Sequence, residues 1–248
     1  MKTIHRLLVM VAILPFFMAC DMHEENMHIP DYTVDIATVQ NPDSGANFFF
    51  KLDDNKLMFV QDCNFVGYTP KDGQRIIATY SILSDKRATH LYDYDVFLND
   101  VYTVLTKGIF NVTKATQDSI GNDSVTINDM WIGSDYLNVD FSYPGYNKTH
   151  YINLVNDTSK VFTDSKIHLF FRHNSNSDTP VYFKRGIASF NLKSLQTGAA
   201  SKILNLVIHV NLPNQAAEKT LNLSYDFSSA LPALAPAKYP KFIPQAYN

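Results

Sequence analysis

Residues 203–227 read ILNLVIHVNLPNQAAEKTLNLSYDF, and this stretch decides the fold class. An apolar residue at every second position is typical of a β-strand that buries one face and exposes the other. The alternation stops at Pro213-Asn214, which is a turn signal, and then resumes. We therefore predict two antiparallel strands with apolar faces formed by Leu204, Leu206, Ile208, Val210 and Leu212, and by Leu221, Leu223, Tyr225 and Phe227.

The same alternation recurs through the second half of the chain. Leu137, Val139, Phe141 and Tyr143 alternate with other residues, and further runs cover residues 149–155, 167–173 and 186–192. Strands that are apolar on one face pack those faces together. Six or more of them predict an antiparallel β-sandwich over residues 128–230.

The first half holds five shorter runs between Pro, Gly and Asp turns, within residues 31–110. One is a hairpin of residues 48–52 and 57–62 around the turn Asp53-Asp54-Asn55-Lys56. Five strands in about eighty residues predict a small closed barrel like an OB-fold. Polar residues 111–127 predict a linker, and the prolines of residues 231–248 predict an extended tail.

The first nineteen residues are typical of a secretory leader, with Lys2 and Arg6 ahead of an apolar run. That run, residues 7–18, is too short to span a bilayer, which needs about 20 residues. Phe17-Met18-Ala19-Cys20 resembles a bacterial lipoprotein signal, which implies acylation of the Cys20 thiol. The alternative is an ordinary cleaved signal followed by a chance cysteine.

We therefore expect a lipid anchor in the outer membrane of a Gram-negative bacterium, followed by a tether over residues 20–30. Asp21, Glu24 and Glu25 in this tether resemble a surface-export tag of some Gram-negative gut bacteria. The alternative is a solvated tether with no export function. If Cys20 carries lipid, Cys63 has no partner in the chain, and its apolar neighbours predict that it is buried.

Composition excludes several classes of protein. With 46% hydrophobic and 18% charged residues, the chain does not resemble a disordered one. Its 21 basic and 24 acidic residues give a net charge of -3, and removal of the leader leaves 19 − 24 = −5. Nucleic-acid binding relies on neutralised phosphates, so we expect no nucleic-acid partner. The expected partners are the membrane and a glycan or envelope protein.

Motifs for catalysis are missing from the sequence. There is no G-x-S-x-G nucleophile elbow, phosphate-binding loop or dinucleotide-binding glycine pattern, so we expect no cofactor and no metal ion. The best polar constellation is His150, Arg172, His173 and Asp178. On a strand over residues 167–173, Arg172 and His173 point to opposite faces. The four residues either serve a metal-dependent enzyme or, as we prefer, tie a strand end to a loop.

Aromatic residues are the stronger indication of a binding surface. OB-folds bind ligands on the face of the second and third strands, beside the loop between the fourth and fifth. Here that face would draw on Phe48, Phe50, Phe59 and Gln61, and the loop would supply Lys86, Arg87 and His90. Stacking rings with a few donors suit a sugar or a peptide chain.

The predicted linker contains two triplets, Asp118-Ser119-Ile120 and Asp123-Ser124-Val125. They resemble the O-glycosylation pattern of some gut-bacterial envelope proteins. Ser119 and Ser124 are therefore candidate modification sites, and a chance match is the alternative.

One family shares this order of features. The segment MWIGSDYLNVDF over residues 130–141, the run Phe171-Arg172-His173-Asn174 and the later Ser189-Phe190-Asn191-Leu192 resemble the NigD-like lipoproteins. The resemblance covers nearly all of the chain after the leader. It implies an N-terminal OB-like domain and a C-terminal β-sandwich, and it carries over no catalytic or binding residue.

The leading hypothesis is a non-enzymatic, lipid-anchored envelope protein that binds a surface glycan or protein. A bacteriocin-associated or immunity-like lipoprotein is the second hypothesis, based on the family name. A metal-dependent enzyme using His150, Arg172, His173 and Asp178 is the third.

Overall fold

The computed structural model describes residues 31–40, 48–63, 68–84, 86 and 92–228. The predicted leader, the tether and residues 231–248 lie outside the described residues. Within the described part of the chain, no helix is both long enough and apolar enough to cross a membrane.

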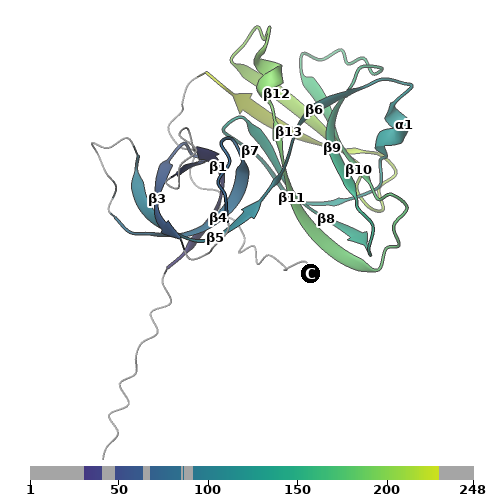
Figure 1. Ribbon diagram of the computed structural model, residues 1–248. Helices are drawn as coiled ribbons and strands as arrows, with labels where there is room; N and C mark the ends of the chain where they lie inside the picture. Colours follow the sequence, from purple (N-terminus) through teal and green to yellow (C-terminus); the bar gives the residue numbers. More distant parts are fainter. Residues whose placement is uncertain (1–30, 41–47, 64–67, 85, 87–91, 229–248) are drawn as a thin grey trace, which may run out of the picture. The chain divides into compact units, whose positions relative to one another are not determined.

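The first five strands form a closed barrel in the order β1-β2-β3-β5-β4. β1 pairs antiparallel with β2 and β4, and β3 pairs parallel with β5. This order confirms the predicted five-stranded, OB-like barrel (Figure 1). The strands are β1 (Thr33–Gln40), β2 (Phe49–Leu52), β3 (Leu57–Cys63), β4 (Arg75–Ile82) and β5 (Tyr94–Thr103).

Alternate residues of these strands fill the barrel, as a period of two requires. Phe50 and Tyr80 pack edge to face with ring centres 5.2 Å apart, and both are almost fully buried. The Tyr80 hydroxyl donates a hydrogen bond to Asp35 at 2.7 Å. The phenol is therefore not left unpaired in the barrel.

The remaining strands form a second, eight-stranded sheet in the order β13-β12-β10-β9-β6-β11-β8-β7. Two short helical turns, α1 (Gln117–Ile120) and a 3-10 turn (Lys193–Gln196), interrupt the connections. The strands are β6 (Leu105–Val112), β7 (Thr126–Gly133), β8 (Tyr136–Gly145), β9 (Tyr151–Asp157), β10 (Ile167–Asn174), β11 (Tyr182–Asn191), β12 (Ile203–Val210) and β13 (Lys219–Asp226).

Strand β6 connects the two layers of this sandwich. Its residues 105–108 pair with β11, and its residues 109–112 pair with β9. All of β6 pairs in the second sheet, so the barrel ends before Leu105 and not at residue 110 as the sequence pattern predicts. The pairs β6–β11, β6–β9 and β10–β12 are parallel, so the sandwich is not purely antiparallel.

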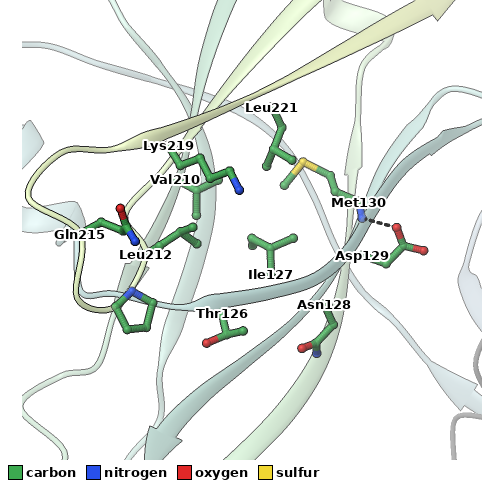
Figure 2. Close-up of a pocket in the computed structure, with 11 residues that line it drawn as sticks. Thr126, Ile127, Asn128, Asp129, Met130, Val210, Leu212, Gln215, Lys219 and Leu221 are labelled. Atoms are coloured by element: carbon green, nitrogen blue, oxygen red, sulfur yellow. Dashed lines mark hydrogen bonds between the residues drawn. The ribbon is translucent and has the colours of Figure 1, made fainter.

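The two ends of the sheet, β7 and β13, leave one side of the sandwich open. A cavity of about 470 Å³ lies there, lined by residues of β7, β12, β13 and the β12–β13 connection (Figure 2). Ile127, Met130 and Leu221 line this cavity and also pack against the sandwich core. We call this open side the seam.

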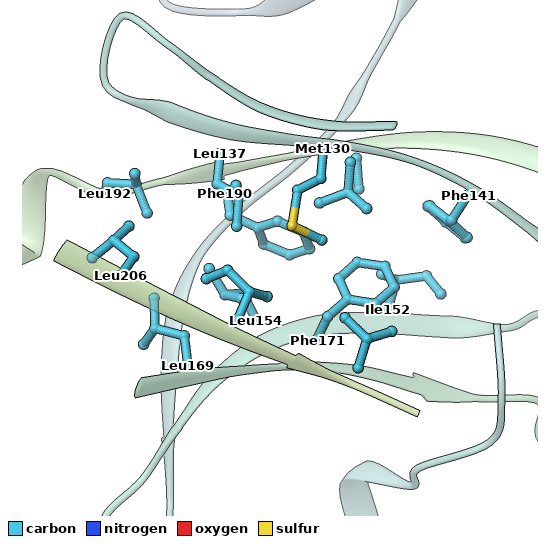
Figure 3. Close-up of a cluster of buried hydrophobic side chains, with 14 of the residues drawn as sticks. Met130, Leu137, Phe141, Ile152, Leu154, Leu169, Phe171, Phe190, Leu192 and Leu206 are labelled. Atoms are coloured by element: carbon cyan, nitrogen blue, oxygen red, sulfur yellow. The ribbon is translucent and has the colours of Figure 1, made fainter. Parts of the chain in front are cut away.

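The sandwich core gathers large apolar side chains from both layers (Figure 3). Phe171 meets Phe141 and Phe190 edge to face, with ring centres 5.3 and 6.0 Å apart. Each fully buried side chain of this size contributes roughly 1.5–3 kcal/mol. This core is therefore the main source of the sandwich's stability.

A buried polar network joins barrel strand β4 to sandwich strand β8. Arg75, with its side chain fully buried, binds both carboxylate oxygens of Asp53, at 2.7 and 3.0 Å, and the Asn138 side-chain oxygen at 2.9 Å. Its guanidinium also lies 4.4 Å from the centre of the Tyr136 ring. The sequence pattern predicts only that Asp53 lies in a turn, because Arg75 and Asn138 are distant from it in the chain.

Candidate binding surfaces

Three aromatic rings gather on the outside of the barrel. Phe49 of β2 lies opposite Phe59 of β3, with ring centres 5.2 Å apart. Tyr92 completes the group, 5.9 Å from Phe49 and 5.1 Å from Phe59. All three residues are half-buried, so each ring keeps some surface in contact with solvent. We call Phe49, Phe59 and Tyr92 the aromatic face.

The predicted binding face is wrong at two positions, Phe48 and Phe50, and Phe50 is fully buried in the barrel core. Phe59 lies on the aromatic face, but Phe48 is only 4% exposed and packs in the barrel core beside Tyr68. In a strand, Phe48 and Phe50 share one side and Phe49 takes the other. Lys51 takes the same side as Phe49, and this polar residue is the sequence signal that marks the outer side of the strand.

The loop before β5 contributes one described cation to this region. The Lys86 amine lies 3.7 Å from the Asp93 carboxylate, and the Lys86 side chain is 62% exposed. The other Asp93 oxygen accepts the Leu57 N–H at 2.9 Å, which ties the loop to β3. Arg87 and His90, the other two predicted residues of this loop, lie outside the described residues.

The predicted polar cluster assembles in part. His150 Nδ1 lies 2.7 Å from His173 Nε2, and His150 Nε2 lies 3.1 Å from an Asp178 oxygen. The His150 and Asp178 side chains are only 2% and 1% exposed. Both imidazole rings pack against the Tyr143 ring. His150, His173 and Asp178 thus form a row, which we call the His–Asp row.

Burial and hydrogen bonding set the charges of this row. Burial, and then the neighbouring His150, lower the pKa of His173 below its usual value. Burial alone would raise the pKa of Asp178. The Tyr146 N–H at 2.5 Å and the His150 side chain outweigh it and hold that pKa below its usual range. Asp178 is therefore a carboxylate that pins the β8–β9 turn.

Gly145 provides the space that this row needs. A β-carbon at that position would lie 2.9 Å from His150 Nε2 and 3.1 Å from the Asp178 carboxylate. Such contacts are too close unless the two side chains move. A glycine at the end of β8 therefore lets the histidine and the carboxylate approach the backbone.

Arg172 does not join the row. It lies on the other face of β10, as the strand alternation predicts, 3.5 Å from Glu218 and stacked over the Phe170 ring. On that face His168 lies 2.9 Å from His209. The predicted cluster of four residues is therefore wrong in its inclusion of Arg172, because neighbouring side chains of a strand point to opposite faces.

The His–Asp row has the geometry of a structural link between three segments of the chain. The ring nitrogens of His150 bind His173 and Asp178, so the three groups follow one another and do not surround a common point. In the described part of the chain, no group of three or more His, Cys, Asp or Glu could hold a metal ion. The arrangement connects the start of β9, the end of β10 and the following loop.

The remaining sequence predictions fall on single residues. Cys63 is exposed at the end of β3, so the prediction of a buried thiol is wrong. Ser119 is exposed in α1, where its hydroxyl donates to the Thr116 carbonyl at 2.7 Å, and Ser124 is half-buried. Cys20 lies outside the described residues. Lipidation and glycosylation remain predictions.

The fold defines a class of two-domain β-proteins, in which an OB-like barrel precedes a β-sandwich. Residues 36–104 match the model of the NigD-like N-terminal OB domain, and residues 108–225 match that of the NigD-like C-terminal β-sandwich domain. The chain belongs to the NigD-like family. No curated protein matches it.

Solved structures from two Bacteroides species share this architecture. A protein of unknown function from Bacteroides vulgatus is 29% identical, with a TM-score of 0.69, and the match covers 83% of this chain and 97% of that one. A NigD-like immunity protein from Bacteroides caccae is 17% identical, with a TM-score of 0.58, over 78% of this chain and 92% of that one. Because the immunity protein is only 17% identical to this chain, the similarity shows only that the two share a fold.

Proposed function

We propose that this protein is a lipid-anchored envelope protein, held in the outer membrane through Cys20, that binds a surface glycan without catalysis. The observation that carries the proposal is the aromatic face of Phe49, Phe59 and Tyr92. It lies over the second and third strands of the barrel, which is where OB-folds bind oligosaccharides.

The chemistry of this face suits a sugar chain. Partly exposed rings offer flat apolar surfaces against the C–H groups of a pyranose, and a few polar groups fix its orientation. Here Asp93 follows Tyr92 in the sequence and forms an ion pair with Lys86, whose side chain is 62% exposed. An ion pair at the rim can exchange its partner for sugar hydroxyls at little cost, because exposed pairs contribute at most about 1 kcal/mol.

The test is binding to envelope polysaccharides of the producing bacterium. Phe59→Ala and Tyr92→Ala should each weaken glycan binding at least about fivefold, since truncating an aromatic residue that carries binding costs more than about 1 kcal/mol. Phe183→Ala is the matched control, because that ring is 83% exposed and belongs to β11 of the sandwich. Equal binding by all three variants would rule out the aromatic face.

A protein partner on the same face is the alternative occupant. Excess purified glycan separates the two cases, because it should elute the detergent-solubilised protein from an immobilised envelope extract only if a sugar is bound. Co-purification of one stoichiometric protein that the glycan does not displace would favour the protein partner.

An immunity-like role is the second candidate function, supported by membership of the NigD-like family. Deletion of the gene should then raise sensitivity to a bacteriocin of a neighbouring strain. If the Phe59→Ala variant restores bacteriocin resistance to the deletion strain, the immunity-like role does not use the aromatic face.

A further inference from the structure

Two exposed tyrosines lie side by side at one end of the sandwich. Tyr146 follows strand β8 and is 50% exposed, and Tyr182 starts strand β11 and is 61% exposed. Their ring centres are 6.1 Å apart, and the ring planes are inclined by 40°. Tyr182 pairs with Gly145, at the end of β8 where β11 begins (Figure 1). We call Tyr146 and Tyr182 the tyrosine pair.

The sandwich core does not use these two rings. Tyr143 and Tyr225 pack in or against the core cluster, but neither member of the tyrosine pair does. Among the described residues, the two phenol hydroxyls of the pair have no hydrogen-bond partner. Tyrosines with one apolar surface and one free polar group are enriched at binding surfaces. The pair is therefore available to a ligand.

Hydrogen bonds to the backbone hold Tyr146 in place. The Asp178 carboxylate accepts the Tyr146 N–H at 2.5 Å, and the Lys184 amine donates to the Tyr146 carbonyl at 2.7 Å. Lys148, in the same turn, donates to two carbonyls of the β10–β11 connection, at 3.2 and 2.9 Å. A ligand thus meets a turn that is already ordered, so its binding loses less conformational entropy.

The His–Asp row fixes the carboxylate that holds this turn. The Asp178 side chain is only 1% exposed, and one of its oxygens lies 3.1 Å from His150 Nε2. A buried and hydrogen-bonded carboxylate has little freedom to move, and its position sets the position of Tyr146. The row therefore supports the tyrosine pair from below, as a rigid binding site requires.

The chemistry around the tyrosine pair suits a sugar. Each ring offers an apolar face to the C–H groups of a pyranose, and each hydroxyl can donate or accept a hydrogen bond. Lys184 adds an ammonium group beside the pair. One of its three N–H groups binds the Tyr146 carbonyl, and no other described residue accepts from it, so two remain for ligand hydroxyls. Apolar surfaces with a few placed polar groups are typical of small-ligand sites.

The size of the pair favours a glycan over a protein as the ligand. The exposed parts of the two tyrosine side chains amount to roughly 200 Å² together. A standard protein interface buries about 800 Å² on each partner. A short stretch of a glycan chain needs no larger contact than two stacked rings, so it matches the surface that is present.

We propose that the tyrosine pair is a second glycan-binding site, in which Tyr146 and Tyr182 stack on sugar rings and Lys184 donates to their hydroxyls. The inference rests on the proposed function only for the class of ligand, because none of its residues belongs to the aromatic face. Either site can therefore fail without the other.

The test is an NMR titration of the full chain in detergent, with carbon-13 in its tyrosine rings. The probes are hexasaccharides of glucose, mannose, galactose and N-acetylglucosamine, each added to about 10 mM because so small a contact binds in the millimolar range. For at least one probe, the ring signals of Tyr146 and Tyr182 should shift together and give one dissociation constant. The Tyr92 signal reports on the aromatic face separately. Tyr102, which is 39% exposed on barrel strand β5, should not shift.

Two variants at neighbouring positions sharpen the test. Tyr182→Ala should weaken the binding that the Tyr146 signal reports at least about fivefold, because truncating an aromatic residue that carries binding has an effect of this size. Phe183→Ala is the matched control. Its ring is 83% exposed but lies on the opposite face of β11, so the dissociation constant should not change.

Three results would overturn the proposal. The first is that no hexasaccharide shifts the Tyr146 and Tyr182 signals, and a shift of Tyr92 in the same titration would still support the aromatic face. The second is a dissociation constant that Tyr182→Ala leaves unchanged. The third is an equal shift of Tyr102, which would show that the sugar contacts exposed tyrosines without a specific site.

Discussion

The Arg75 guanidinium binds the Asp53 carboxylate through two hydrogen bonds, of 2.7 and 3.0 Å, with the arginine side chain fully buried. Asn138 binds both partners, accepting from Arg75 and donating to Asp53, each at 2.9 Å. Such a pair carries a large desolvation cost, and its hydrogen bonds must offset that cost. Removing one partner therefore has a larger effect than removing an exposed ion pair.

Asp53→Ala should lower the free energy of unfolding by about 3–5 kcal/mol, because it leaves the Arg75 charge buried without its counter-ion. Urea denaturation measures this change. Asp54→Ala, one residue along, is the control. It breaks a pair with Lys56, whose side chain is 36% exposed, and should cost at most about 1 kcal/mol. Similar losses of unfolding free energy in Asp53→Ala and Asp54→Ala would contradict a special contribution of the buried Arg75–Asp53 pair.

Gly133→Ala should also destabilise the protein through Asp53. A β-carbon at residue 133 would overlap the Asp53 side chain, so the carboxylate would have to leave Arg75. Gly108→Ala is the matched control, because no atom lies within 4 Å of its added carbon. We expect a melting temperature several degrees lower for Gly133→Ala only, since about 1 kcal/mol shifts it by roughly 2–4 °C in a chain of this size. Equal melting temperatures would show that Asp53 can move freely.

The pKa of His173 makes stability depend on pH. Burial and the neighbouring His150 lower this pKa in the native state, so on acidification the unfolded chain takes up a proton first. The free energy of unfolding should therefore fall as the pH drops from about 7 to about 5, with a slope of at most about 1.4 kcal/mol per pH unit from this one group.

His173→Gln should reduce that slope, measured by urea denaturation across the same pH range. His209, whose pKa is also lowered by burial, should account for a second part of the slope, which His209→Gln would remove. An unchanged slope in His173→Gln would show that His173 titrates alike in both states.

Cys20→Ala should abolish labelling of the protein by a fatty-acid probe, because the lipoprotein signal implies acylation at this thiol. Cys63→Ala is the control, since it removes the other cysteine and should leave labelling unchanged. Gel fluorescence after metabolic labelling measures both. Labelling that persists in Cys20→Ala and disappears in Cys63→Ala would contradict the lipid anchor at Cys20.

The aromatic face shows where sequence reasoning reached its limit. Alternation located the hairpin of β2 and β3, and general OB-fold knowledge located its binding side. Three phenylalanines in a row fit either orientation when taken alone, but Lys51 marks the side of Phe49 as the outer one, and the burial of Phe48 and Phe50 confirms it. Tyr92 joined the face through ring contacts that a linear pattern does not show.

By itself, the sequence determined the all-β class and the division into barrel and sandwich, because alternation and turns are local properties of the chain. It also indicated that Arg172 and His173 lie on opposite faces of one strand. Only the tertiary structure decided the parallel pairs, the Arg75–Asp53–Asn138 network and the partners of His150. These contacts join residues that are distant in sequence, and only the packing of the strands brings them together.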